Sequence, residues 1–152
     1  MLKIYLDNCC YNRPFDDLTN EKNALEAKAI EDILVRAVNK EVKLYNSATV
    51  DYELYSTTEG NKKNQVENLY NLLDLEYIQH SESIEQRVDE LEKQNIHHMD
   101  AYHIAYSEEG NVDYLITTDK QMLNSGRKSD TKIKIINPIE LIIGGGMVWI
   151  MQ

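Results

Sequence analysis

The segment Asp100-Ala101-Tyr102-His103-Ile104-Ala105 is followed, beyond Gly110, by Tyr114-Leu115-Ile116-Thr117-Thr118-Asp119. The first stretch is amphipathic and is closed by a glycine, which predicts a helix. The apolar run that follows, Val112 to Thr117, is typical of a buried strand. A helix that leads into a buried strand is the repeating unit of an α/β fold. The rest of the chain is therefore expected to alternate in the same way.

The neighbouring segments keep this alternation. Short strands are predicted at Lys3–Leu6, Val42–Tyr45 and Lys132–Ile136, and helices at about 20–39, 47–57, 66–73, 83–93 and 138–143. Residues 8–18 are rich in turn formers and predict turns. We therefore expect a single α/β domain over residues 1–152, a three-layer sandwich with a central, mostly parallel sheet flanked by helices.

The composition is that of an ordinary globular domain, with 152 residues of which 42% are apolar. No apolar run reaches the roughly 18 residues of a transmembrane helix, and the first residues lack the pattern of a secretory signal. Cys9 and Cys10 are adjacent, so a disulfide between them is disfavoured. We expect a cytoplasmic protein that does not contact a membrane.

The net charge of −10 comes from 26 acidic and 16 basic residues. A general nucleic-acid binder normally carries a basic surface, so this charge argues against that class. A polyanionic substrate would have to be held locally. Residues 120–134 are the one clearly basic stretch and are predicted either to contact phosphates or to form a solvated loop.

Four acidic residues occupy positions from which they can meet. Asp7 and Asp119 each follow a predicted strand, and the carboxyl ends of parallel strands lie at one edge of a sheet, where ligands gather. Asp100 lies in the first turn of its helix, from which its side chain is expected to point past the helix end. Glu53 lies further along the helix that begins near Ser47. Converging carboxylates repel each other unless cations lie between them, and oxygen ligands suit Mg²⁺ or Mn²⁺.

Each acid also has an ordinary explanation when it is taken alone. An aspartate after a strand is commonly a turn residue or a helix cap, and one in a first helical turn complements the helix dipole. Glu53 alone would be read as surface charge. Asp51, two residues earlier, is expected on another face of the helix. The physical argument therefore rests on the four positions together.

The chain resembles the PIN-domain family at four places. These are Ile4-Tyr5-Leu6-Asp7-Asn8, Ser47-Ala48-Thr49-Val50-Asp51-Tyr52-Glu53-Leu54, Asp100-Ala101-Tyr102-His103-Ile104-Ala105 and Leu115-Ile116-Thr117-Thr118-Asp119. Many PIN-domain proteins are metal-dependent ribonucleases, including the toxins of VapBC-type toxin–antitoxin pairs. The resemblance implies an acidic catalytic and metal-binding site of Asp7, Glu53, Asp100 and Asp119, an Mg²⁺ or Mn²⁺ cofactor and an RNA substrate. It also makes a small antitoxin protein a candidate partner, and we expect a homodimer.

The chain departs from the family pattern in two places. Members typically continue the first motif with a small hydroxyl residue and an asparagine, where this chain has Asn8 and Cys9. Many members carry another acid or an aromatic residue soon after the fourth motif, where this chain has Lys120-Gln121-Met122. A ligand role for these positions is therefore not expected. Thr117 or Thr118 remains a candidate to supply a hydroxyl to the water shell of the metal.

The ligand set suggests a mechanism. A bound ion would lower the pKa of a water molecule for in-line attack on a phosphodiester, and a second ion would stabilise the leaving oxygen. Arg13, Thr118 and Lys120 are the candidate contacts to the substrate, although both cations are equally explained as solvated surface residues. His103 is expected to be structural.

Two other functions compete with a ribonuclease. A catalytically inactive PIN-like interaction module would share the fold, but it has no reason to concentrate four acids. A phosphoryl-transfer protein that uses Asp7 as a nucleophile normally has a second aspartate two residues later, where this chain has Cys9. The sequence therefore favours a metal-dependent endoribonuclease.

Overall fold

The computed structural model describes residues 1–57 and 60–143. Five parallel strands in this part of the chain form a sheet in the order β3-β2-β1-β4-β5. The strands are β1 (Leu2–Leu6), β2 (Val42–Asn46), β3 (Leu75–Tyr77), β4 (Tyr114–Ile116) and β5 (Lys134–Ile136). The predicted α/β class with a parallel central sheet is confirmed.

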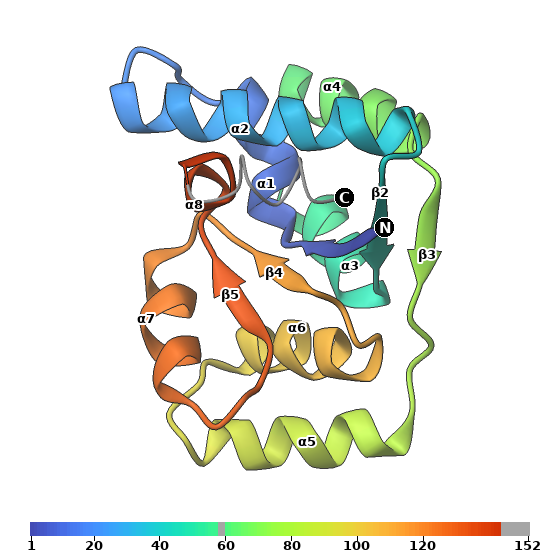
Figure 1. Cartoon of the computed structure of the whole chain (residues 1–152), viewed down its shortest axis with the longest axis vertical. Coiled ribbons are helices and arrows are strands. Elements are labelled where there is room, and N and C mark those ends of the chain that lie inside the picture. Colours follow the sequence, from blue (N-terminus) through green and yellow to red (C-terminus); the bar gives the residue numbers. More distant parts are fainter. Residues whose placement is uncertain (58–59, 144–152) are drawn as a thin grey trace.

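Helices cover both faces of this sheet. They are α1 (Asn8–Asn12), the 3₁₀ turn η1 (Arg13–Phe15), α2 (Glu21–Val38), α3 (Ala48–Thr57), α4 (Gly60–Asn71), α5 (Glu82–Glu92), α6 (His98–Glu109), α7 (Lys120–Lys128) and α8 (Pro138–Ile143). Helices α2 and α4 lie on one side of the strands and α5 and α6 on the other (Figure 1). This arrangement is the predicted three-layer sandwich. No helix among the described residues is long and apolar enough to cross a bilayer.

The order of the strands creates a switch point between β1 and β4. From β1 the chain moves outward through β2 to β3, and it then returns to place β4 on the other side of β1. The two strands are in register at Leu6 and Ile116, and the amide of Asp7 donates to the carbonyl of Ile116 over 3.0 Å. In open parallel sheets ligands bind beyond the carboxyl ends of the strands at such a point. Asp7 and the residues after Ile116 therefore flank the expected site.

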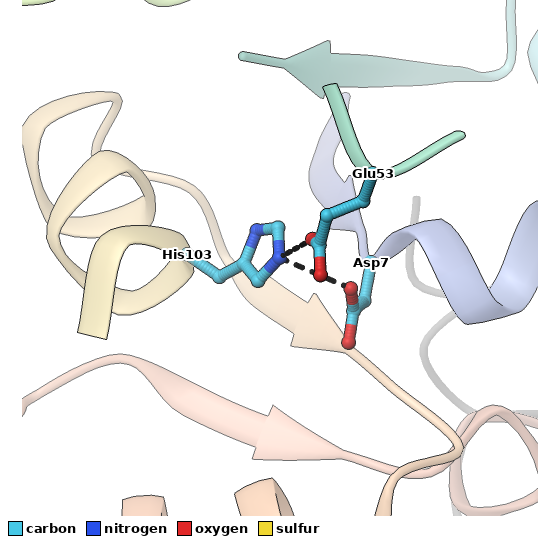
Figure 2. Close-up of side chains that lie close together, drawn as sticks. All are labelled: Asp7, Glu53 and His103. Carbon is cyan, nitrogen blue, oxygen red and sulfur yellow. Dashed lines mark hydrogen bonds and ion pairs between the residues drawn. The ribbon is translucent and has the colours of Figure 1, made fainter. Parts of the chain in front are cut away.

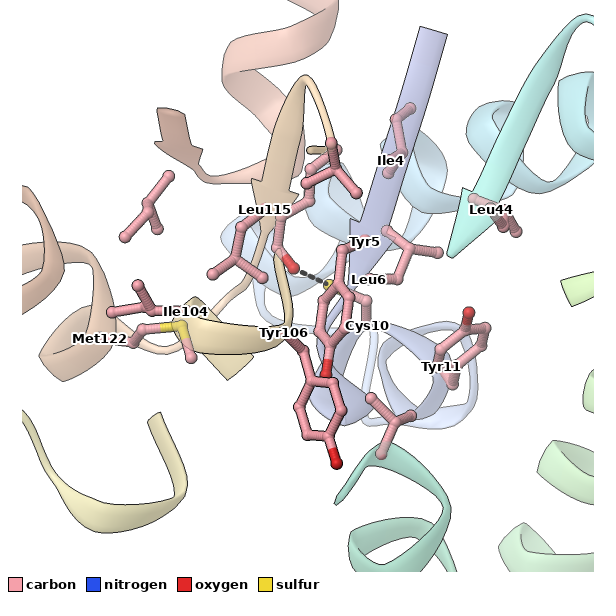
Figure 3. Packing of buried hydrophobic residues seen from close by; sticks show 14 of the residues in the cluster. Ile4, Tyr5, Leu6, Cys10, Tyr11, Leu44, Ile104, Tyr106, Leu115 and Met122 are labelled. Atoms are coloured by element: carbon pink, nitrogen blue, oxygen red, sulfur yellow. Dashed lines mark hydrogen bonds between the residues drawn. The ribbon is translucent and has the colours of Figure 1, made fainter. Parts of the chain in front are cut away.

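The central strand β1 is buried on both faces. Ile4, Tyr5 and Leu6 have no exposed surface, as expected for a parallel strand that is covered by helices on both sides. Figure 3 shows these residues packed with Leu115 of β4 and Ile104 of α6. Side chains alternate along a strand, so Tyr5 and Asp7 point to the same face of the sheet. This burial fixes the strand end that carries Asp7.

Several predicted elements differ from those in the structure. Residues 8–18 were expected to be turns but contain α1 and η1, because the Asp7 carboxylate caps a short helix. The basic stretch from residue 120 contains helix α7 rather than a loop, since Asp119 caps it and Met122 and Leu123 bury its inner face. Strand β3 has only three residues, half-buried or exposed, and was not predicted. Helix α5 begins one residue before Ser83, and its N-cap residue makes no side-chain capping bond.

Candidate functional site

Asp7 is fixed from both sides of the switch point. Its side chain is 4% exposed. Oδ1 accepts a hydrogen bond of 2.7 Å from the amide of Asn8, at the start of α1. Oδ2 accepts one of 2.8 Å from the hydroxyl of Thr117, which follows β4. The carboxylate is thus oriented by two neighbouring strand ends rather than by one loop.

His103 joins Asp7 to Glu53. Its ring is buried on α6, and Nε2 lies 3.2 Å from Oδ1 of Asp7 and contacts Oε1 of Glu53. Figure 2 shows the imidazole facing both carboxylates, that of Asp7 directly after β1 and that of Glu53 on α3. On the other side of the ring, Nδ1 lies 2.8 Å from the hydroxyl of Tyr5. That hydroxyl lies 2.6 Å from Oγ of Ser47, so a buried polar chain runs from Ser47 to the two acids.

The neighbouring acids determine the charge of His103. Burial alone would lower its pKa, but the charge of Asp7 and the hydrogen bond and charge of Glu53 outweigh burial and raise the pKa to about 9. The ring is therefore an imidazolium at neutral pH, and both of its nitrogens are donors. Nε2 then donates to the carboxylates, and Nδ1 donates to Tyr5, whose hydroxyl donates to Ser47. Burial raises the pKa of Tyr5 as well, so its hydroxyl stays protonated.

Asp100 is buried, although it lies in the first turn of its helix. It is the third residue of α6 and is only 8% exposed. Burial and the charges of Asp119 and Asp7 raise its pKa to about 6, against a smaller opposing effect of His103. The three acids thus share one electrostatic environment, and the charge of His103 only partly offsets their repulsion. A site that binds a cation has this property.

Asp119 and Glu53 are less buried than Asp7 and Asp100. Asp119 is exposed and caps α7, with its carboxylate accepting from the amide of Gln121 over 2.9 Å. Its own amide donates to the Thr117 hydroxyl over 3.0 Å, so Thr117 connects the segment of Asp119 to Asp7. Glu53 is half-buried and is joined to Asp7 by His103. Of the four predicted acids, the structure brings ligand atoms of Asp7 and Glu53 together at His103, whereas Asp100 and Asp119 interact with Asp7 and with each other through charge.

The three predicted substrate contacts occupy different environments. Arg13 pairs with Asp16 at 2.8 Å and with the buried Glu26 at 3.2 Å, so its guanidinium supports the fold. Thr118 is 7% exposed, and its amide donates to the Cys9 sulfur over 3.4 Å. Lys120 is exposed at the start of α7, directly after Asp119. Lys120 is thus the one of the three that is both exposed and next to the acids.

Sequence reasoning missed the part that His103, Tyr5 and Ser47 play in the site. His103 was expected to be structural, and it is, but it supports the acids themselves. The available signal was its position three residues after Asp100, which places both side chains on one helix face. The hydrogen bond between Tyr5 and His103 joins residues 98 positions apart in the sequence, and it depends on the packing of α6 against β1. No local pattern carries that information.

The side chains present suit a hard divalent cation. Ligand atoms of Asp7, Glu53 and His103 all lie within 4.8 Å of one another, and the two carboxylates are the ligands available there, because both nitrogens of the charged His103 ring carry protons. Asp100 and Asp119 add carboxylates whose mutual repulsion raises the pKa of Asp100. Carboxylate oxygens are the ligands that Mg²⁺ and Mn²⁺ prefer, and a cation there would relieve this repulsion. The cluster therefore fits a divalent metal better than an anion.

Comparisons with known proteins identify a family and two structures of similar fold. The sequence matches the family model described as PIN domain over residues 4–128. No match was found among curated proteins. Two solved structures are similar in fold: VapBC2 from Rickettsia felis, bound to a DNA fragment from their promoter, and PAE2754 from Pyrobaculum aerophilum. The first has a TM-score of 0.62 and 16% identity, covering 90% of this chain and 98% of that one. The second has a TM-score of 0.58 and 13% identity, covering 99% and 91%.

Proposed function

Because the chain belongs to the PIN domain family, we propose that it is a divalent-metal-dependent endoribonuclease that hydrolyses RNA phosphodiester bonds. The observation that carries this proposal is geometric: ligand atoms of Asp7 and Glu53 lie within 4.8 Å of each other at the switch point of the sheet, and the charges of Asp7 and Asp119 act on the buried Asp100. Burying acids together costs stability unless a cation or a proton offsets their charge. A divalent cation bound by these acids would offset the cost in stability and could take part in phosphodiester hydrolysis.

In this proposal the four acids have a common role and their neighbours have supporting ones. Asp7, Glu53, Asp100 and Asp119 hold Mg²⁺ or Mn²⁺. An ion held by these carboxylates would lower the pKa of a water molecule and neutralise charge on the phosphodiester. Thr117 and His103 orient the carboxylates, as their hydrogen bonds indicate.

The proposed contacts to the RNA lie beside the acids. Lys120, exposed next to Asp119, contacts a substrate phosphate. Thr118 lies close to the same edge of the sheet and is a weaker candidate. Arg13 takes part only if a phosphate displaces its carboxylate partners, Asp16 and Glu26. Among the described residues, no side chain is needed as a nucleophile, since water is the attacking group.

We also propose that the protein is the toxin of a toxin–antitoxin pair. It would act in the cytoplasm as a homodimer and be restrained by a small antitoxin protein. The support is the fold that the chain shares with VapBC2 of Rickettsia felis. The test is co-purification of the protein with the small protein that an adjacent short reading frame encodes. Binding of that small protein should abolish RNA cleavage.

RNA cleavage tests the enzymatic proposal. Purified protein is incubated with structured and single-stranded RNAs in Mg²⁺, in Mn²⁺ or in EDTA, and products are resolved by length. We expect cleavage by the wild type in either metal, none in EDTA and none by Asp100→Asn. Asp89→Asn is a matched control, because it removes one exposed carboxylate on α5. Cleavage that survives EDTA or Asp100→Asn would overturn the proposal, and a wild type that cuts no RNA would favour an inactive interaction module.

A further inference from the structure

A polar pocket lies where α3, α4 and β3 meet. Its volume is about 380 Å³, within the range of small-molecule sites. The side chains that line it include Asp51, Tyr55, Tyr70, Asp74 and Tyr77. Nothing in the proposed metal chemistry uses these residues.

The carboxylate of Asp51 is held in place at one wall of this pocket. Oδ1 accepts hydrogen bonds from the hydroxyl of Tyr70, from that of Tyr77 at 3.0 Å and from the side-chain amide of Asn46 at 3.2 Å. Oδ2 is contacted by the Tyr77 hydroxyl alone, also at 3.0 Å, among the bonds that the described residues make. Asp51 therefore presents an oriented oxygen with room for a further donor.

The pocket and the acidic site lie along one edge of the sheet. Tyr77 is the last residue of β3 and Asn46 the last of β2, and Asp7 directly follows β1. Neighbouring strands are about 4.8 Å apart, so the ends of β3 and β1 are roughly 10 Å apart. Helix α3 connects the two sites directly, because it carries both Asp51 and Glu53. A strand of nucleic acid with one phosphate at the proposed cation site would bring a nearby base to the pocket.

The chemistry of the pocket excludes a phosphate and suits a base. Its lining contains two aspartates and, within the part of the chain that the structure describes, no lysine or arginine. Tyr55 is 60% exposed and Tyr77 45% exposed, so their rings are available for stacking. Base–tyrosine stacking is a common way to bind single-stranded nucleic acid. A carboxylate accepts hydrogen bonds from the amino group of a base, as it does from that of cytosine.

We propose that this pocket binds one base of the RNA substrate, and that Asp51 selects bases with an exocyclic amino group over uracil. The inference rests on the proposed ribonuclease function, because it assigns the ligand as part of an RNA. It places the specificity of the enzyme outside the metal site. Tyr55 contributes stacking, and Tyr70 and Tyr77 orient the carboxylate.

Binding of single nucleosides tests the pocket without metal or catalysis. Isotope-labelled protein in EDTA is titrated with cytidine and with uridine, and amide shifts are followed by NMR. We expect shifts around Asp51 and Tyr77, with cytidine binding about tenfold more tightly than uridine. Asp51→Asn should remove this ratio, and Tyr55→Ala should weaken both nucleosides about tenfold. Asp89→Asn on α5, a control for charge, should behave as the wild type.

The outcomes separate this inference from the proposed function. Shifts elsewhere than the pocket, or a cytidine preference that survives Asp51→Asn, would overturn the inference even if the protein cleaves RNA. If the wild type cuts no RNA, the ribonuclease proposal fails while the nucleoside titration still decides whether the pocket binds a base. If the amide spectrum shows that Asp51→Asn does not fold, the Tyr55→Ala variant decides whether the pocket binds a base, because that exposed ring supports little of the core. Unchanged nucleoside affinity in Tyr55→Ala would then overturn the inference.

Discussion

Nε2 of His103 lies 3.2 Å from Oδ1 of Asp7, and the same nitrogen contacts Glu53. The imidazolium therefore supplies positive charge between two of the acids that we propose as metal ligands. Asp100, three residues earlier on the same helix, has a pKa raised to about 6 by burial and by Asp119 and Asp7. The negative charge of Asp7 and Glu53 is thus partly balanced by His103. The charge of Asp100 and Asp119 is left for a bound cation to balance.

Replacing His103 by glutamine is expected to destabilise the metal-free protein in a pH-dependent way. The folded pKa of His103, about 9, exceeds the usual 6.5, so its stabilisation is complete below pH 6.5 and is lost as the pH rises through 9. We expect a loss of about 2–4 kcal/mol at pH 6, because two carboxylates are left without their cation. Urea denaturation in EDTA at pH 6 and at pH 9.5 measures the difference, and an equal loss at both values would contradict this reading.

Tyr5→Phe tests the chain behind His103. The change keeps the buried ring but removes the hydroxyl that lies between Ser47 and Nδ1 of His103. We expect a loss of about 1–3 kcal/mol in unfolding free energy, because two buried polar groups lose a partner. Tyr52→Phe is the control, since Tyr52 is 64% exposed. If the denaturation curves of the two variants coincide, the hydrogen-bonded series Ser47–Tyr5–His103 does not stabilise the fold.

Asp100→Asn is expected to stabilise the metal-free protein. Its folded pKa of about 6 lies above the usual 3.8, so the folded state holds more protons between these values and stability falls as the pH rises through this window. The amide carries no charge and avoids this loss. We expect a gain of about 1–3 kcal/mol at pH 7 and almost none below pH 4. Chemical denaturation in EDTA at both values checks the sign, and a variant less stable than the wild type at pH 7 would contradict it.

A pair of substitutions separates the two predicted cationic contacts. Arg13→Gln should lower the unfolding free energy by about 2–4 kcal/mol, because it leaves the buried Glu26 without its cation. Lys120→Gln should leave stability almost unchanged, since this side chain is exposed, and should raise the KM for RNA severalfold. Thermal unfolding and initial cleavage rates measure both. An Arg13→Gln protein of full stability but raised KM would make Arg13 a substrate contact instead.

The sequence predicts the layout of the fold but not its short elements. Strand β1 can be read from its apolar run and helix α2 from its helical periodicity, and their alternation with the other segments indicates the parallel sheet. Strand β3 has three residues without a clear apolar pattern, and α7 is a short helix in a stretch that is polar on average. Both form because of tertiary contacts, which override weak local preference.

The site is predictable to a similar degree. Asp7 and Asp119 could be placed because the end of a parallel strand has a known location in the sheet. The burial of Asp100 could not be predicted, because it depends on how α6 packs against the sheet near the ends of β1 and β4. His103, Tyr5 and Ser47 form one chain only after three distant segments have packed together. Contacts of this kind follow from the fold and have no pattern in the sequence.

Calorimetric titration with Mn²⁺ tests the central claim most directly. Protein stripped of metal with EDTA and then dialysed free of the chelator is titrated at pH 7.5, with Asp89→Asn as the charge control. We predict saturable binding to the wild type and to the control, competition by Mg²⁺, and affinity reduced at least about tenfold in Asp100→Asn, which loses one charged ligand. A wild type that binds no Mn²⁺, or an Asp100→Asn variant that binds it equally well, would contradict the assignment of this acidic cluster as a metal site.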